Sequence, residues 1–261
     1  MTSVRFPAVA GMFYPDDPVA LDEMVRTYLE SSTAEGPVPK AIIAPHAGYV
    51  YSGPVAASAY RLLIPAKDVI KSVILLGPAH RVPFRGLAAP GMDFFMTPLG
   101  SVAVDKKAIE AIADLPWVTI SDTPHEPEHS LEVHLPFLQE VLDDFTVAPI
   151  VVGDATPEEV AAVLERLWNG PETLIVISSD LSHYHDYTTA RKMDTATSQA
   201  IESLDPEALT FESACGRIPV AGLLLAAKKH GLKAKTVDLR NSGDTAGPKD
   251  QVVGYGAYAF Y

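Results

Sequence analysis

Three apolar segments of this 261-residue sequence end in side chains that can bind a metal or transfer a proton. The segment AIIAPHAG ends around His46, SVILLGPAH ends at His80, and TLIVISSDLSH ends at Asp180 and His183. Short runs of apolar and β-branched residues are typical of strands buried on both faces, and open α/β sheets bind ligands beyond the carboxyl ends of such strands. The sequence therefore predicts that these four side chains meet in one crevice.

The histidines that end the first two segments have a simple and a chemical interpretation. Either one alone could be a strand-terminal histidine bonded to a backbone carbonyl. A proline directly precedes His46 and another lies two residues before His80, so the backbone is restricted where each imidazole leaves its strand. Because a metal ion requires ligands that are held by rigid elements, the two histidines together favour a shared metal site.

Asp180 and His183 form a carboxylate–imidazole pair at the end of the third segment. Such a pair fits a general base with its orienting partner, or a carboxylate that supports a metal-bound histidine. On an extended chain the two side chains would point to opposite faces, so a turn must bring them together. The alternative is a helix cap followed by solvent-exposed histidines, and this alternative stays open for His185.

A fourth group of ionisable residues lies in the segment EPEHSLEVHLPF. On a helix, His134 would face the core with the leucines around it, whereas Glu132 would project elsewhere. Packing alone can therefore explain His134. Four ionisable residues crowd the expected start of this helix, namely Glu128, His129, Glu132 and His134. The last three of them could line a pocket or support a ligand.

The composition limits the partners and the compartment. A formal charge of −13 opposes binding to nucleic acid or to anionic lipid, because both require clustered lysine and arginine. There is no run of about 20 apolar residues and no signal-peptide pattern, so we expect a cytoplasmic protein without membrane association. Cys215 is the single cysteine, which excludes an intrachain disulfide and leaves a packed thiol, a metal ligand or a nucleophile.

The hydrophobic pattern alternates between strand and helix periods along the chain. It predicts a single α/β domain over residues 1–261, with three layers and a mostly buried mixed sheet between helices. Asp105, Ser130 and Thr156 are the expected N-caps, and Pro136 should kink its helix or move the start later. Residues 48–53 should form a loop, and residues 81–104 should form loops and an antiparallel hairpin. The expected strands are 41–47, 72–80, 146–153, 173–183, 233–240 and 252–261, and the expected helices are 18–31, 55–64, 105–115, 130–145, 156–168, 189–203, 206–213 and 220–231.

Six blocks of the sequence closely resemble the Memo family, which is found in prokaryotes as the B component of the AmmeMemoRadiSam group. The blocks are long, occur in the family's order and cover nearly the whole chain, so the resemblance is far more specific than a single short motif. It implies a fold similar to that of the class III extradiol dioxygenases, non-haem iron enzymes that open catechol rings. The blocks are GMFYPDDP, APHAGYVYSGPVAASAY, LLGPAHR, EHSLEVHLPFL, VISSDLSHY and CGRIPVAGLL.

The resemblance also implies roles for individual residues. It makes His46, His80 and Cys215 the metal ligands, His183 the acid/base histidine and Asp180 the aspartate beside it. The family often has tryptophan at position 13, where this chain has a phenylalanine that keeps an apolar wall but lacks the indole N–H donor. The residues expected to line the pocket or to support the ligands are Phe13, Tyr14, Tyr49, Tyr51, His129, Glu132, His134 and Arg217.

The expected ligand set differs from that of the dioxygenases, which hold Fe²⁺ with two histidines and one carboxylate. The resemblance makes Fe²⁺ the first expectation, and Zn²⁺ or copper are the alternatives because a thiolate from Cys215 is softer and donates more charge than a carboxylate. The expected function is that of a metal-dependent, dioxygenase-related oxidoreductase acting on a small substrate. The alternatives are a metal-dependent hydrolase and a binding or scaffold protein. Radical SAM and AMMECR-type proteins are possible partners by the same resemblance.

Overall fold

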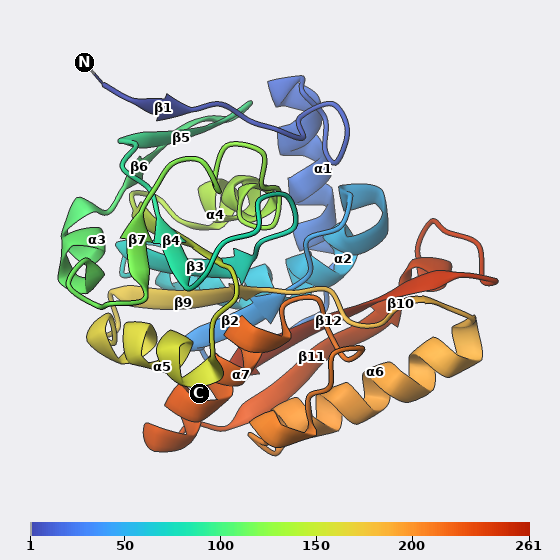
Figure 1. Ribbon diagram of the computed structural model, residues 1–261. Coiled ribbons are helices and arrows are strands. Elements are labelled where there is room, and N and C mark those ends of the chain that lie inside the picture. The colour runs from blue at the N-terminus through green and yellow to red at the C-terminus, as the bar shows by residue number, and fades with distance from the viewer. Residues whose placement is uncertain (1) are drawn as a thin grey trace.

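The computed structural model describes residues 2–261 and has one mixed β-sheet at its centre with helices packed on both faces (Figure 1). Within the described residues the sheet has twelve strands, and most of them run in the order β1-β5-β6-β8-β3-β9-β2-β12-β10. The strands are β1 (Val4–Arg5), β2 (Ala41–Ala44), β3 (Ser72–Pro78), β4 (Leu87–Ala89), β5 (Phe94–Thr97), β6 (Gly100–Val104), β7 (Val118–Ile120), β8 (Thr146–Val152), β9 (Thr173–Ser178), β10 (His183–His185), β11 (Ala234–Asn241) and β12 (Val252–Phe260). This architecture confirms the predicted α/β fold class.

The centre of the sheet consists of the parallel strands β8, β3, β9 and β2, which are the apolar runs of the sequence. Nearly every residue of these strands is buried, because helices cover both faces. β12 runs antiparallel to β2 on one side and to β11 on the other. The three strands β3, β9 and β2 are neighbours, so their carboxyl ends lie together at one edge of the sheet.

Seven α-helices flank this sheet within the part of the chain that the structure describes. Helices α1, α2 and α4 pack together on one side, α3, α5 and α7 pack together on the other, and α6 packs on β11 and β12. Asp105 and Thr156 are the N-caps of α3 and α5, as predicted, and Thr156 forms a capping box. None of these helices has the length and apolar character needed to span a bilayer. The helices are α1 (Pro18–Ser31), α2 (Tyr49–Tyr60), α3 (Lys106–Ile112), α4 (Leu135–Val141), α5 (Pro157–Arg166), α6 (Tyr187–Glu202) and α7 (Arg217–Lys229).

The predicted loop over residues 48–53 is wrong, because α2 begins at Tyr49 and continues through Pro54. Gly53 allows this helix to lie directly against α1, since a Cβ atom at this position would come within 2.5 Å of the Tyr28 ring. The Tyr49 side chain is also buried against Phe137 of α4. Tertiary packing therefore overrides the local glycine and proline signals.

The segment around Pro136 also differs from the prediction. A 3₁₀ turn (Glu132–His134) precedes α4, and Pro136 lies in the first turn of that helix, so the helix starts later, as expected. Ser130 is not the cap, because its hydroxyl donates a hydrogen bond to the Pro78 carbonyl oxygen at 2.8 Å. The helix predicted over 206–213 is only a 3₁₀ turn (Pro206–Ala208), whereas β5 and β6 confirm the predicted antiparallel hairpin.

Candidate functional site

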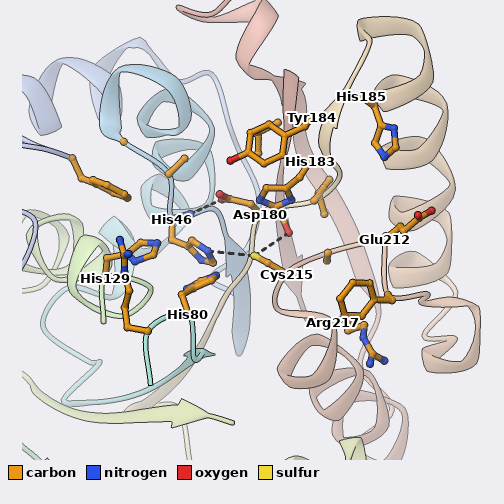
Figure 2. A pocket seen from close by; sticks show the side chains of 18 residues that line it. His46, His80, His129, Asp180, His183, Tyr184, His185, Glu212, Cys215 and Arg217 are labelled. Atoms are coloured by element: carbon orange, nitrogen blue, oxygen red, sulfur yellow. Dashed lines mark hydrogen bonds between the residues drawn. The ribbon is translucent and has the colours of Figure 1, made fainter. Parts of the chain in front are cut away.

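A pocket of about 850 Å³ opens at the carboxyl ends of the central parallel strands (Figure 2). His46, His80 and Asp180 each lie two residues beyond the end of their strand, which is β2, β3 and β9 respectively. Cys215 reaches the same pocket from the turn before α7. The structure therefore brings these residues together in one pocket, as the strand ends predicted for His46, His80 and Asp180. The pocket is lined by Phe13, His46, Ala47, Gly48, His80, Arg81, His129, Asp180, Leu181, His183, Tyr184, His185, Phe211, Glu212, Ala214, Cys215, Arg217 and Val253.

His46 is buried and its imidazole is fixed by a chain of hydrogen bonds. The Ser178 hydroxyl donates to the Ser130 carbonyl oxygen at 2.6 Å, so it must accept a hydrogen bond from His46 Nδ1, which lies 2.6 Å away. Nδ1 therefore carries the proton, and Nε2 keeps its lone pair. Burial, together with the neighbouring histidines, lowers the pKa of His46, so the imidazole is neutral at pH 7.

His80 is oriented by a carboxylate. Glu128 accepts a hydrogen bond from the His80 backbone N–H at 2.6 Å, and its Oε1 lies 2.9 Å from His80 Nδ1. Burial opposes ionisation of Glu128, but the hydrogen bonds from His80 and from further backbone N–H donors outweigh it and lower the pKa of Glu128 to about 2. An ionised carboxylate only accepts, so Nδ1 of His80 donates, and in the neutral imidazole Nε2 is left with a lone pair.

Cys215 lies beside His46, with 3.3 Å between Cys215 Sγ and His46 Nε2. Burial, and next the nearby charge of Asp180, raises the pKa of the Cys215 thiol to about 12. The side chain is therefore a neutral thiol at pH 7 when no cation lies beside it. A thiol in these surroundings is a poor nucleophile, and a cation in the pocket would favour its thiolate form.

His46, His80 and Cys215 together fit a metal ion. Their potential ligand atoms all lie within 4.8 Å of one another, and two neutral imidazoles with one thiolate are a ligand set for Fe²⁺, Zn²⁺ or copper. A second group, formed by His80, Glu128 and His129, meets the same distance limit. Glu128 already accepts hydrogen bonds from four N–H groups, so it is less free to bind an ion than Cys215.

Asp180 and His183 lie on the wall of the same pocket. The Asp180 carboxylate accepts a hydrogen bond from the His46 backbone N–H at 2.7 Å. Burial raises the pKa of Asp180 to about 6, although the His46 N–H and the charge of His183 oppose this shift. His183 begins β10, and the next residue, Tyr184, has a φ of 61°, which is rare for a residue with a side chain. The pairing of β10 with β12 is irregular here, with a register shift between His183 and His185.

His129 and Phe13 form an aromatic part of the wall. The His129 ring stacks on His80 with 4.7 Å between ring centroids, and it lies 4.9 Å from the Phe13 ring. Burial lowers the pKa of His129 to about 4, so this ring is neutral at pH 7. Arg217, also expected in the pocket, lies on the opposite wall from His129 (Figure 2).

Five other residues expected in the pocket do not line it. Tyr14, Tyr49, Glu132 and His134 are buried in the core, and the partly exposed Tyr51 is not part of the pocket wall. The Tyr49 hydroxyl donates to the backbone carbonyl of residue 133 at 2.6 Å. His134 faces the core, as its helical spacing suggests, with its Nδ1 2.8 Å from the hydroxyl of Tyr60. None of the five is therefore part of the pocket wall, because Tyr14, Tyr49, Glu132 and His134 are engaged in the core and Tyr51 is exposed outside the pocket.

Glu132 has a structural partner far away in the sequence. Its carboxylate forms a buried ion pair with Arg5, with 2.6 Å between Glu132 Oε2 and the Arg5 guanidinium. It also accepts hydrogen bonds from the backbone N–H groups of Ala8 and Val9 and from the Tyr14 hydroxyl. Arg5 in turn donates to the carbonyl oxygens of residues 125, 126 and 128. This network fixes the segment that carries Glu128, and through it His80.

Sequence patterns alone did not identify the two residues that orient the imidazoles. Ser178 lay inside the strand predicted over residues 173–183, and Glu128 was only one of several ionisable residues near a helix start. A serine or glutamate near a histidine is too common to indicate this role. Phe211, Tyr184 and Arg81 were likewise not singled out, although they line the pocket.

Two buried histidines outside the pocket should make stability depend on pH. Burial lowers the pKa of His125 to about 4 and that of His134 to about 3, whereas an unfolded histidine titrates at about 6.5. Their stabilising contribution is complete above the unfolded pKa and is lost as the pH falls toward the folded value. Protonation of each histidine should lower the free energy of unfolding by about 2 kcal/mol at pH 5 relative to pH 7.5. Asp180, with its raised pKa, acts in the opposite direction and loses its contribution as the pH rises through about 6.

Urea unfolding of wild type and His134→Leu at pH 7.5 and pH 5 checks this prediction. The wild type should lose about 2 kcal/mol more than the variant over this interval, because the variant has no imidazole to protonate at this position. Equal losses in the two proteins would show that His134 does not remain neutral in the folded state.

Comparison with known proteins agrees with the pattern of blocks in the sequence. Residues 5–259 match the family described as Memo-like protein. A MEMO1 family protein of Aquifex aeolicus is 39% identical over 97% of this chain and 97% of its own length, and one of Saccharolobus islandicus is 36% identical over 98% and 99%. A crystal structure of an uncharacterised Escherichia coli K12 protein aligns with a TM-score of 0.47 at 11% identity, covering 82% of this chain and 98% of that one, which is too distant to support an inference. On the first two findings, the chain belongs to the Memo-like protein family.

Proposed function

We propose that this protein is a metal-dependent enzyme in which His46, His80 and Cys215 hold one metal ion for chemistry on a small molecule. Fe²⁺ is the proposed ion, with Zn²⁺ or copper as alternatives. The observation that carries the proposal is the orientation of the two imidazoles. Ser178 and Glu128 engage the Nδ1 atoms, which leaves the Nε2 atoms of the neutral imidazoles for an ion, and one ring nitrogen of each histidine lies within 4.8 Å of the other and of the Cys215 sulfur.

When bound, such an ion supplies Lewis acidity to an oxygen or nitrogen of the substrate. The protein residues around it have separate tasks. His183 lines the pocket and is proposed to transfer a proton to or from the substrate. The Asp180 carboxylate accepts a hydrogen bond from the His46 backbone N–H at 2.7 Å. From the same wall of the pocket, its negative charge is proposed to stabilise His183 when that imidazole accepts a proton. The rings of His129 and Phe13 supply an aromatic wall that limits access of water.

The reaction that we propose is oxidation of a small substrate, related to that of the extradiol dioxygenases. Hydrolysis is the second candidate for an enzyme, and the observation that favours it is the cysteine. A thiolate at the position where the dioxygenases have a carboxylate is compatible with Zn²⁺ and is itself open to oxidation. A binding role without catalysis is favoured by a different observation, the exposed aromatic side chains of Tyr184 and Phe211 at the pocket.

Turnover assays of metal-loaded protein separate these candidates. Protein loaded with Fe²⁺ without oxygen is given a panel of catechols with oxygen, and a panel of esters and amides without it. Wild type and the surface control His230→Ala should turn over one of the panels, and His183→Ala should be slower by about 100-fold or more while keeping its metal. Ring opening supports the oxidoreductase, and oxygen-independent hydrolysis supports the hydrolase. If no panel reacts and small planar ligands bind equally to wild type and His183→Ala, the catalytic proposal is wrong.

A further inference from the structure

Tyr184 has an unusual backbone conformation at the wall of the pocket. Among residues 2–261, only Tyr184 and Leu204 combine a side chain with a positive φ, and their φ values are 61° and 51°. A side chain in this left-handed region crowds the following carbonyl oxygen, so glycine is the residue that usually occupies it. Tyr184 lines the pocket, whereas Leu204 does not. The pocket therefore holds an aromatic residue in a conformation that favours glycine.

The conformation of Tyr184 belongs to a β-bulge between β10 and β12. His183 pairs with Val253, and His185 pairs with the adjacent residue of β12. Tyr184 is thus an extra residue without a partner on β12. Side chains alternate between the two faces of a regular strand, which would place Tyr184 on the face opposite to both histidines. All three side chains nevertheless line the same pocket. The bulge therefore turns the Tyr184 side chain toward the pocket, which is a common use of bulges next to active sites.

The fold gains little from the tyrosine ring itself. Tyr184 is 71% exposed, so its side chain buries only a small apolar area against the rest of the chain. The ring lies next to the imidazole of His183, with 5.8 Å between the ring centroids and an interplanar angle of 67° (Figure 2). Glycine would form the same bulge without strain. Neither core packing nor the backbone therefore accounts for an aromatic side chain at this position.

The position of the ring suits contact with a substrate. The pocket of about 850 Å³ has room for a small molecule, and Phe13, His129 and Phe211 add further aromatic side chains to its lining. Because the rings of His183 and Tyr184 are neighbours, a molecule that reaches the His183 imidazole also comes against the Tyr184 ring. The exposed face of that ring is free to pack against a second flat ring.

We infer that Tyr184 is a specificity-determining residue that contacts the substrate, and that the substrate presents an unsaturated ring to it. The inference rests on the proposed function, because it places the reacting part of the substrate beside His183. An aromatic ring can pack on Tyr184 in an offset or edge-to-face arrangement, whereas a saturated ring of similar size has no π-system for this contact. Tyr184 then favours aromatic over saturated substrates.

Two ligands that carry the same pair of hydroxyl groups test the inference. The dissociation constants of catechol and of trans-1,2-cyclohexanediol are measured by ligand-observed NMR with metal-free protein in the absence of oxygen. Wild type should bind catechol more tightly, and Tyr184→Asn should reduce this preference by about threefold to tenfold. Tyr184→Phe keeps the ring and should stay within about twofold of wild type. Phe6→Asn removes a ring that is equally exposed, at 72%, but lies outside the pocket wall, and this matched control should leave the preference unchanged.

Thermal unfolding of the same variants shows whether the ring has a structural role instead. Asparagine tolerates a positive φ better than tyrosine, so the Tm of Tyr184→Asn should lie no more than about 4 °C below that of wild type. A larger decrease would overturn the inference, because the ring would then stabilise the fold. An unchanged catechol preference in Tyr184→Asn also overturns it, and so does an equal reduction in Phe6→Asn. The binding measurement requires no metal and no turnover, so a reduced preference in Tyr184→Asn alone supports the inference even if the cluster binds no ion.

Discussion

Replacement of Cys215 by serine is expected to lower the affinity for Fe²⁺ or Zn²⁺ by more than about 100-fold, since even loss of a group that only supports a ligand costs up to that much. The physical reason is that the sulfur lies 3.3 Å from His46 Nε2, and a serine hydroxyl in its place does not ionise to an anionic ligand at neutral pH. The fold should remain intact, because serine has nearly the same size. Competition with a chelator of known affinity measures the change, and thermal unfolding of the metal-free proteins checks the fold.

Two further variants decide which cluster holds the ion. His185→Ala removes a pocket histidine that belongs to neither cluster, and it should retain wild-type affinity. His129→Ala removes a member of the second cluster and should weaken binding far less than Cys215→Ser. Full stoichiometry and affinity in Cys215→Ser, together with loss of metal in His129→Ala, would assign the ion to His80, Glu128 and His129 instead.

Replacement of Glu132 by alanine is expected to destabilise the protein by about 3–5 kcal/mol. The variant leaves the Arg5 guanidinium buried without its carboxylate, and the side chains of both residues are almost fully inaccessible to solvent. It also removes the acceptor for the Ala8 and Val9 backbone N–H groups and for the Tyr14 hydroxyl. Urea unfolding at pH 7.5 measures the loss.

Two control variants show whether the buried charge is responsible. Glu132→Gln keeps oxygen and nitrogen atoms in place and should lose less stability than Glu132→Ala. The double variant Arg5→Met/Glu132→Leu removes both charges and should be more stable than Glu132→Ala, since replacement of a whole buried pair is often tolerated. A loss below about 1 kcal/mol in Glu132→Ala would mean that this pair does not hold the segment in place.

The sequence predicted those residues of the site that follow an apolar strand. Each of three residues lies two positions beyond its strand, namely His46 after β2, His80 after β3 and Asp180 after β9. Adjacent parallel strands bring such positions together at one edge of the sheet, independently of the rest of the fold. Cys215 was different, because it ends no strand and its place in the pocket was implied only by the resemblance to the Memo family.

The contacts between distant segments could not be predicted. Helical spacing indicated that Glu132 projects away from the core, but it is buried because Arg5, 127 residues away, pairs with it. The start of α2 at Tyr49 was not predicted for the same reason, because packing of Tyr49 against Phe137 stabilises the helix there. Ser178 orients His46 only because β9 lies beside β2. In each case the deciding partner lies outside the range over which periodicity and capping signals act.

The central claim, that His46, His80 and Cys215 together bind one metal ion, is tested most directly by X-ray absorption spectroscopy of the wild-type protein loaded with Fe²⁺ or Zn²⁺. The expected spectrum has one sulfur scatterer at about 2.3 Å and two imidazole nitrogens at about 2.1 Å from the metal. The sulfur contribution should be absent from any metal that Cys215→Ser retains. A wild-type spectrum with only nitrogen and oxygen scatterers would contradict the claim, because Cys215 supplies the chain's one thiol.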